Sequence, residues 1–225
     1  MLQQSTLHFI SNLQKNNNKE WFEAHRNKYE SAKLDFEKLI ASILDEQTKI
    51  DSDLEGLSAK NCIFRINRDV RFSKNKDPYK SNFGASMDRG GKKSKFAGYY
   101  FHLEPGNKSM VGGGLWMPEA PEVKKVRQEI DYCFTEFSDI LSEKQFKKIF
   151  KDLYRGEDVS LVKVPQGFEK ENPAATYLKL KSWFTLHTIH DKDLTSNGLI
   201  KKVTDAYSAL MPLVKFLNRA VEDHG

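Results

Sequence analysis

The sequence has little cysteine and no long apolar run. Only two cysteines, Cys62 and Cys133, occur in 225 residues. Their wide separation matches neither a metal-binding nor a redox spacing, so we expect two reduced packing residues in a cytoplasmic protein. No apolar stretch is long enough to span a bilayer, so we expect no membrane span. The first residues lack the basic segment and apolar run of a signal peptide, and we expect none there.

Internal repeats, low-complexity tracts and long linkers are also lacking. Hydrophobic residues make up 39% of the chain and aromatic residues 12%, which is typical of an ordered globular protein rather than a disordered one. A chain of this length buries a substantial core. We therefore expect residues 1–225 to form one domain.

The positive charge is concentrated in one segment. Residues 65–95 contain ten lysines and arginines against three aspartates, a net charge of +7, whereas the whole chain carries +5. The remainder of the chain is therefore slightly acidic. This distribution describes a local basic patch, which indicates a site for an anionic partner rather than a generally basic protein.

Both ends of the chain show a helical hydrophobic period. Apolar residues recur at steps of three and four, which predicts helices over about residues 5–13, 18–43, 123–137, 146–153 and 196–217. His25 lies on the stripe of the second helix and is interpreted as a packed side chain. The letters SEKQ at residues 142–145 resemble a capping box. Pro212 should kink or divide the last helix.

The middle of the chain shows a period of two instead. Alternating apolar residues predict strands over residues 63–72, 82–87, 98–103 and 109–115, with strand-like pieces at 161–164 and 177–185. Short connections between consecutive strands favour antiparallel pairing. The sequence therefore predicts an α+β fold, with an antiparallel β-meander of about four or more strands flanked by N-terminal and C-terminal helices.

The predicted strand IFRINRDVRF at residues 63–72 carries an anomaly. Regular alternation places Arg68 on the same face as four apolar side chains, with Arg65, Asp69 and Arg71 on the opposite face. An unpaired cation on an apolar face is costly. We therefore expect that Arg68 has an acidic partner, that a bulge turns it away, or that it reaches into a cleft.

Several strings of the sequence are familiar. The run RINRDVRFSKNKDPYK, followed by a strand and then GGGLWMPE, resembles an uncharacterised family known as domain of unknown function 2461. NNNKEWFEAHRNKY near the N-terminus, VPQGF at residues 164–168, Asn172-Pro173 and residues 178–184 extend the resemblance over most of the chain. Gln166 departs from it, because a basic residue is usual there. The resemblance implies an α+β fold and names no activity, substrate or cofactor.

The basic segment predicts an anion-binding site. Arginine forks suit carboxylate and phosphate groups because they donate paired, planar hydrogen bonds. Asp69 would orient the arginines or act as a base, and the end of the strand from Gly112 to Trp116 would form a wall. The predicted ligand-binding residues are Arg65, Arg68, Arg71, Tyr79, Lys80, Gly113 and Trp116.

Histidine provides the best general acid–base candidate. His102 shares a strand face with Tyr100 and could approach Arg65 or Arg71 if the strands pair in the right register. His187 and His190 have no third ligand at a convincing spacing, so we predict no metal site. The glycines at residues 112–114 match no nucleotide-binding motif, which favours a structural role for them.

Three functions are consistent with these residues. The first is a cytoplasmic protein, with or without catalytic activity, that binds a small molecule bearing phosphate or carboxylate groups. The second is a nucleic-acid-associated protein that uses the same patch and the basic loop at residues 89–95. The third is a structural or partner-binding module in which the arginines only form internal ion pairs.

Overall fold

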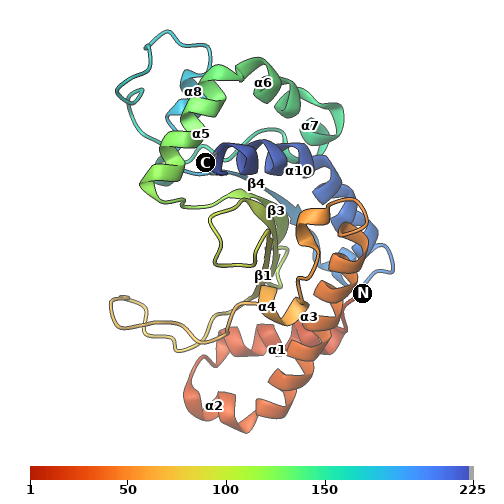
Figure 1. Cartoon of the computed structure of the whole chain (residues 1–225). Coiled ribbons are helices and arrows are strands. Elements are labelled where there is room, and N and C mark those ends of the chain that lie inside the picture. Colours follow the sequence, from red (N-terminus) through yellow and green to blue (C-terminus); the bar gives the residue numbers. More distant parts are fainter. Residues whose placement is uncertain (223–225) are drawn as a thin grey trace.

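The computed structural model describes residues 1–222 and has the predicted α+β fold (Figure 1). A four-stranded antiparallel sheet has the order β1-β2-β3-β4. Its strands are β1 (Phe83–Asp88), β2 (Gly98–Leu103), β3 (Ser109–Leu115) and β4 (Trp183–Ile189). The first three strands form a meander, and β4 joins the sheet after a helical segment.

The helices before the sheet differ from the prediction at one point. They are α1 (Gln4–Lys15), α2 (Lys19–Ala24), α3 (Arg26–Gln47) and the short α4 (Ala59–Cys62), with a 3-10 turn, η1 (Ser52–Leu54). The predicted helix over residues 18–43 is divided at His25. His25 stacks on Trp21 at 4.2 Å, and its Nδ1 lies 2.8 Å from the Trp21 carbonyl oxygen. The His25 ring therefore forms a hydrogen bond with a backbone carbonyl group in the last turn of α2.

The helices after β3 contain a similar division. They are α5 (Ala120–Tyr132), α6 (Phe134–Ser142), α7 (Lys144–Phe150), α8 (Ala175–Leu178), α9 (Asp191–Leu194) and α10 (Leu199–Val221), with a 3-10 turn, η2 (Glu157–Val159). The predicted helix over residues 123–137 is divided at Cys133. Glu143, not Ser142, caps α7 by accepting hydrogen bonds from the next backbone N–H groups. α10 continues through Pro212, with buried Leu210 and Leu213 on either side.

Of the two predicted strand-like pieces, one is wrong and the other is right only at its end. Residues 161–164 form no strand, and the segment at 177–185 begins as the end of α8 and becomes a strand only at Trp183. Both pieces contain mixed apolar and polar residues without a clear period. The conformation of these two segments is therefore set by their contacts with the rest of the fold and not by an alternating pattern of their own.

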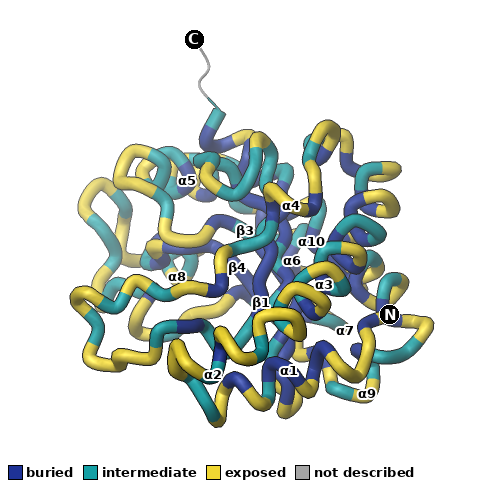
Figure 2. The backbone as a smooth tube through the Cα atoms, turned by 90° about the horizontal axis from the view of Figure 1, so that it is seen from below, coloured by how far each residue is buried: buried dark blue, intermediate teal, exposed yellow. Residues whose placement is uncertain are grey.

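One face of the sheet, the covered face, packs against helices. The Phe36 ring of α3 lies 5.5 Å from Phe83 and 6.0 Å from Phe101, and Tyr207 of α10 lies 4.9 Å from Tyr99. Buried residues concentrate along the strands at the centre of the molecule (Figure 2). The opposite face, the open face, carries the half-buried side chains of Ser86, Tyr100 and His102. No helix within residues 1–222 is long and apolar enough to cross a membrane.

Candidate functional site

The basic segment forms an irregular arm at the edge of β1. This basic arm comprises residues 63–82 and projects from the body of the molecule (Figure 1). The N–H of Phe64 donates to the Gly84 carbonyl at 2.9 Å, and that of Lys80 donates to the Ile66 carbonyl at 2.8 Å. Only isolated bridges form, so the predicted strand over residues 63–72 is wrong. Beyond its base, the arm can pair within residues 1–222 only with its own returning half. Pro78 lies in that half and lacks an N–H, so it cannot donate the hydrogen bond that would continue the pairing.

Arg68 holds the arm together. Its guanidinium donates to the Asp77 carbonyl oxygen at 3.1 Å and to Ser73 Oγ at 3.3 Å. Without regular alternation Arg68 does not lie on an apolar face, which removes the anomaly that the sequence raised. Its partners are neutral oxygens of the arm itself. Arg68 therefore joins the two halves of the arm.

Asp69 and Arg71 form an exposed ion pair. Arg71 Nη2 lies 2.6 Å from Asp69 Oδ2, and this pair holds the pKa of the Asp69 carboxyl below its ordinary value. A carboxyl with a lowered pKa is a weaker base. The geometry therefore favours the orienting role predicted for Asp69 over the base role. Of the three arginines in the arm, only Arg71 forms an ion pair within residues 1–222.

Two lysines lie over the Phe64 ring at the base of the arm, and the charge of Arg65 acts on one of them. The Lys80 and Lys92 Nζ atoms lie 5.4 and 5.9 Å from the Phe64 ring centroid. Burial, followed by the charge of Arg65, lowers the pKa of Lys80. Lys92 also donates to the Ile63 carbonyl at 2.6 Å. We call Arg65, Lys80 and Lys92 the cation cluster; none of them pairs with a carboxylate within residues 1–222.

A hydrogen-bonded chain of titratable side chains lies on the open face. The Tyr100 hydroxyl lies 3.1 Å from His102 Nδ1, and His102 Nε2 lies 3.0 Å from Glu104 Oε2. An ionised carboxylate only accepts, so Nε2 carries the proton and Nδ1 accepts from Tyr100. Burial raises the pKa of Tyr100, which keeps its hydroxyl protonated. We call these three residues the Tyr–His–Glu relay.

Phe64 connects the relay to the cation cluster. Its ring centroid lies 6.5 Å from that of Tyr100. A Cβ atom placed on Gly84 would lie 2.9 Å from the Tyr100 hydroxyl and 3.5 Å from the Phe64 ring. A side chain at this position would therefore crowd both aromatic groups. Because Gly84 has no side chain, Tyr100 of the relay and Phe64 at the base of the arm can lie close together.

Two more of the predicted ligand-binding residues, Tyr79 and Lys80, line a small cavity beside the arm together with Arg68. Tyr79 is buried, its ring stacks on Phe22 at 3.9 Å, and burial raises its pKa. The cavity has a volume of about 460 Å³. Its walls come from the arm, α1 and the end of β2, and include Arg68, Tyr79, Lys80, Gln14 and Glu104. Arg65, Asp69 and Arg71 do not line it.

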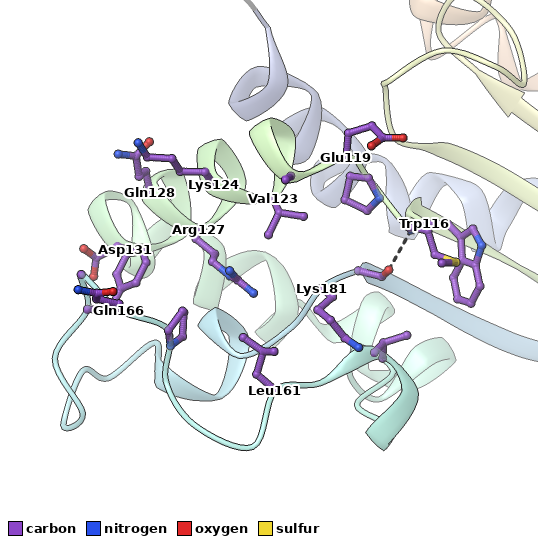
Figure 3. Close-up of a pocket in the computed structure, with 18 of the residues that line it drawn as sticks. Trp116, Glu119, Val123, Lys124, Arg127, Gln128, Asp131, Leu161, Gln166 and Lys181 are labelled. Carbon is purple, nitrogen blue, oxygen red and sulfur yellow. Dashed lines mark hydrogen bonds between the residues drawn. The ribbon is translucent and has the colours of Figure 1, made fainter.

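The predicted wall lies elsewhere. Gly113, with φ of 153°, is buried within β3, where a Cβ would lie 2.1 Å from the Gly98 carbonyl oxygen. This glycine allows two strands to pair closely, as the structural reading of the glycine run expects. Trp116 is 58% exposed, packs edge-on against Phe184 at 4.7 Å, and lines a different cavity beside α5 (Figure 3). Neither residue lines the cavity beside the arm.

Sequence reasoning missed Lys92, Glu104 and Phe64 as members of the site. The spacing of Tyr100, His102 and Glu104 carried a signal, because residues two apart share a strand face. Lys92 carried none, since the fold of its loop brings it to Phe64. Within residues 1–222, no group of three histidine, cysteine, aspartate or glutamate side chains is arranged to hold a metal ion.

The fold and site define an α+β protein with a basic arm at the edge of its sheet and a Tyr–His–Glu relay on the open face. The chain matches the model of a family described as "Conserved hypothetical protein (DUF2461)" over residues 5–216, and it belongs to that family. The resemblance seen in the sequence is thereby confirmed. No curated protein and no solved structure matches the chain.

Proposed function

We propose that the protein binds a small molecule bearing phosphate or carboxylate groups at the cation cluster. The observation that carries this proposal is that Lys80 and Lys92 both lie over the Phe64 ring, that the charge of Arg65 acts on Lys80, and that none of the three forms an ion pair with a carboxylate within residues 1–222. Burial and then the charge of Arg65 lower the pKa of Lys80, so part of this shift reflects repulsion between like charges. A bound anion would relieve this repulsion and accept hydrogen bonds from all three side chains.

The Tyr–His–Glu relay would handle a proton beside that ligand. Tyr100 donates its hydroxyl proton toward His102 Nδ1, and the carboxylate of Glu104 stabilises the ring when it becomes charged. The Tyr100 oxygen would then be free to accept a proton from a ligand hydroxyl. This arrangement supports general acid–base chemistry on an anionic ligand. The two cysteines are free, which supports a cytoplasmic location.

Calorimetric titration with inorganic phosphate, pyrophosphate and citrate at low ionic strength tests the proposal. We expect at least one of these anions to bind the wild-type protein. Lys80→Gln and Lys92→Gln should each weaken binding by about tenfold, because each removes one charge-assisted contact. Lys74→Gln is the matched control, because it removes an exposed charge of the same arm that does not belong to the cation cluster.

Two results would overturn this proposal. One is the failure of all three anions to bind at millimolar concentration. The other is an equal loss of affinity in Lys80→Gln and Lys74→Gln, which would mean that the total charge of the arm, and not the cation cluster, attracts the ligand.

A second function, binding of single-stranded nucleic acid, is favoured by Phe72. Its side chain is 96% exposed on the projecting arm, and the Arg71 guanidinium lies 5.8 Å from its ring centroid. Exposed aromatic rings beside cations can stack nucleobases and contact the phosphate backbone. Fluorescence polarisation of a labelled oligonucleotide should show binding that falls steeply between about 50 and about 200 mM salt. Phe72→Ala should weaken it, and no binding at low salt would rule this function out.

A further inference from the structure

A second cavity lies beside α5, away from the basic arm. It has a volume of about 1050 Å³, which is close to the upper limit of about 1000 Å³ for small-molecule sites. α5, the segment after β3 and the loop at residues 158–168 form its walls (Figure 3). None of the residues of the cation cluster or of the Tyr–His–Glu relay lines it. The proposed anion site therefore does not account for this cavity.

The walls of this cavity expose large apolar side chains. Trp116, Met117 and Tyr132 are 58%, 70% and 85% exposed, and all three line it. Val123, Leu161 and Phe168 add further apolar surface. A cluster of exposed apolar side chains in a cavity is typical of a binding site, where a ligand covers the apolar surface.

The backbone at the cavity is also unusual. Met117 has a φ of 45°, in the left-handed region that side chains other than those of glycine and asparagine rarely adopt. Its N–H donates to the buried Ser182 Oγ at 2.9 Å, which holds this conformation. Conformations of this kind persist where the surrounding structure maintains them, and they are frequent at ligand sites.

Arg127 brings an unpaired cation to the cavity. Its Nη2 donates to the Leu180 carbonyl at 2.9 Å, but its Nε is buried without a hydrogen-bond partner. No carboxylate within residues 1–222 forms an ion pair with it, and burial lowers the pKa of its guanidinium. Figure 3 shows the side chain extending from α5 toward Leu161 and Lys181. A partly buried guanidinium without an acidic partner is costly unless an acceptor reaches it.

We propose that this cavity binds a hydrophobic monocarboxylate, in which one carboxylate is attached to an aromatic or branched apolar body. The carboxylate accepts hydrogen bonds from Arg127, and the apolar body lies against Trp116 and Leu161. The Nη end of a guanidinium carries four N–H donors, of which the Leu180 carbonyl takes one in Arg127, and such donors match the two oxygens of a carboxylate. Apolar walls around one such polar anchor are the usual composition of a small-molecule site.

The remaining charges favour a ligand with a single negative charge. Glu119, Asp131 and Asp158 line the cavity together with Lys124 and Lys181, so these charges nearly cancel. Three carboxylates would repel a ligand with several phosphates. This cavity therefore differs in selectivity from the cation cluster, where no carboxylate of residues 1–222 pairs with the cations.

Titration with 3-phenylpropionate and 4-methylpentanoate, followed by the indole N–H signal of Trp116 in NMR spectra, tests this proposal. The neutral amide 3-phenylpropanamide is the matched ligand control, because it keeps the apolar body without the charge. We expect the acids to bind and to shift the Trp116 signal. The amide should bind about tenfold or more weakly, because it cannot form the charge-assisted pair.

Variants of α5 locate the contact. Arg127→Met should lower the affinity for the acids to that of the amide, whereas Lys124→Met, which removes a cation from the same helix and cavity, should change it by less than about twofold. Arg127→Lys keeps the charge but loses the planar fork, so it tests the same contact if Arg127→Met does not fold. Equal binding of acid and amide, unchanged binding in both Arg127 variants, or no binding at about 10 mM acid would overturn the proposal.

Discussion

Two adjacent tyrosines of β2 lie on opposite faces of the sheet and have opposite surroundings. On the covered face, the Tyr99 hydroxyl donates to the buried Asp51 carboxylate at 2.6 Å, and its ring packs on Tyr207. On the open face, Tyr100 donates to His102 beside the cation cluster. On the covered face, the polar groups therefore form hydrogen bonds with one another inside the core. The open face keeps titratable groups near solvent, where a ligand can reach them.

The largest expected difference between the two faces concerns packing. Phe101→Ala removes a fully buried ring from the covered face and should lower the free energy of unfolding by about 3–5 kcal/mol. His102→Ala, at the next residue, removes two partly buried hydrogen bonds and should cost about 2 kcal/mol. Urea unfolding of both variants gives the two values. Equal losses would show that the open face is part of the core, which would contradict its role as a ligand surface.

A carboxyl group on the open face should make stability depend on pH. Burial raises the pKa of Asp88 to about 6 from 3.8, although Ser86 donates a hydrogen bond to it. Between these values the folded protein keeps a proton that the unfolded chain has lost. The free energy of unfolding should therefore fall as pH rises from about 4 to about 6, by up to about 3 kcal/mol, and this contribution is constant above that window.

Asp88→Asn removes this titration and tests its sign. The variant should lose this part of the decrease in stability between about pH 4 and about pH 6, because asparagine carries no titrating proton. Asp77→Asn, at an exposed carboxylate of the basic arm, is the control and should keep the wild-type profile. Urea unfolding across this pH range compares the three proteins. An unchanged profile in Asp88→Asn would mean that other groups produce the pH dependence.

The sequence predicted the elements whose signals are local. Strands β2 and β3 have the predicted bounds, because their alternation and the turn between them are written in consecutive residues. The predicted strand over residues 63–72 failed, because pairing there depends on a distant segment that does not pair continuously. Local propensity could not reveal this difference.

The candidate site was predictable only in part. The concentration of charge found the basic arm, and Lys80 and Arg65 belong to its cation cluster. Their role in ligand binding stays a prediction. Arg127 carried no signal, because an arginine on an amphipathic helix resembles a solvated surface residue until its burial is known. Trp116 was assigned to the arm because the sequence could not show which loop it faces.

The same substitution on the two faces should separate stability from binding. Tyr99→Phe leaves the buried Asp51 carboxylate without one donor and should cost about 1–3 kcal/mol, with phosphate affinity unchanged. Tyr100→Phe should cost less than about 1 kcal/mol, because water can reach half-buried His102, but should weaken ligand binding. Urea unfolding and calorimetric titration of both variants test this crossed pattern. A loss of phosphate affinity in Tyr99→Phe alone would reverse the assignment of the two faces.

The smallest expected effect lies within the basic arm, where two substitutions that each remove one positive charge can be compared. Arg71→Gln removes a cation that Asp69 already neutralises in an exposed pair, so neither the thermal midpoint nor the phosphate affinity should change measurably. Lys80→Gln removes a half-buried cation without a carboxylate partner, and it should weaken phosphate binding. Thermal unfolding and calorimetric titration compare the two variants. Equal weakening by Arg71→Gln would extend the anion site along the whole arm, as an extended nucleic-acid strand requires and a small anion does not.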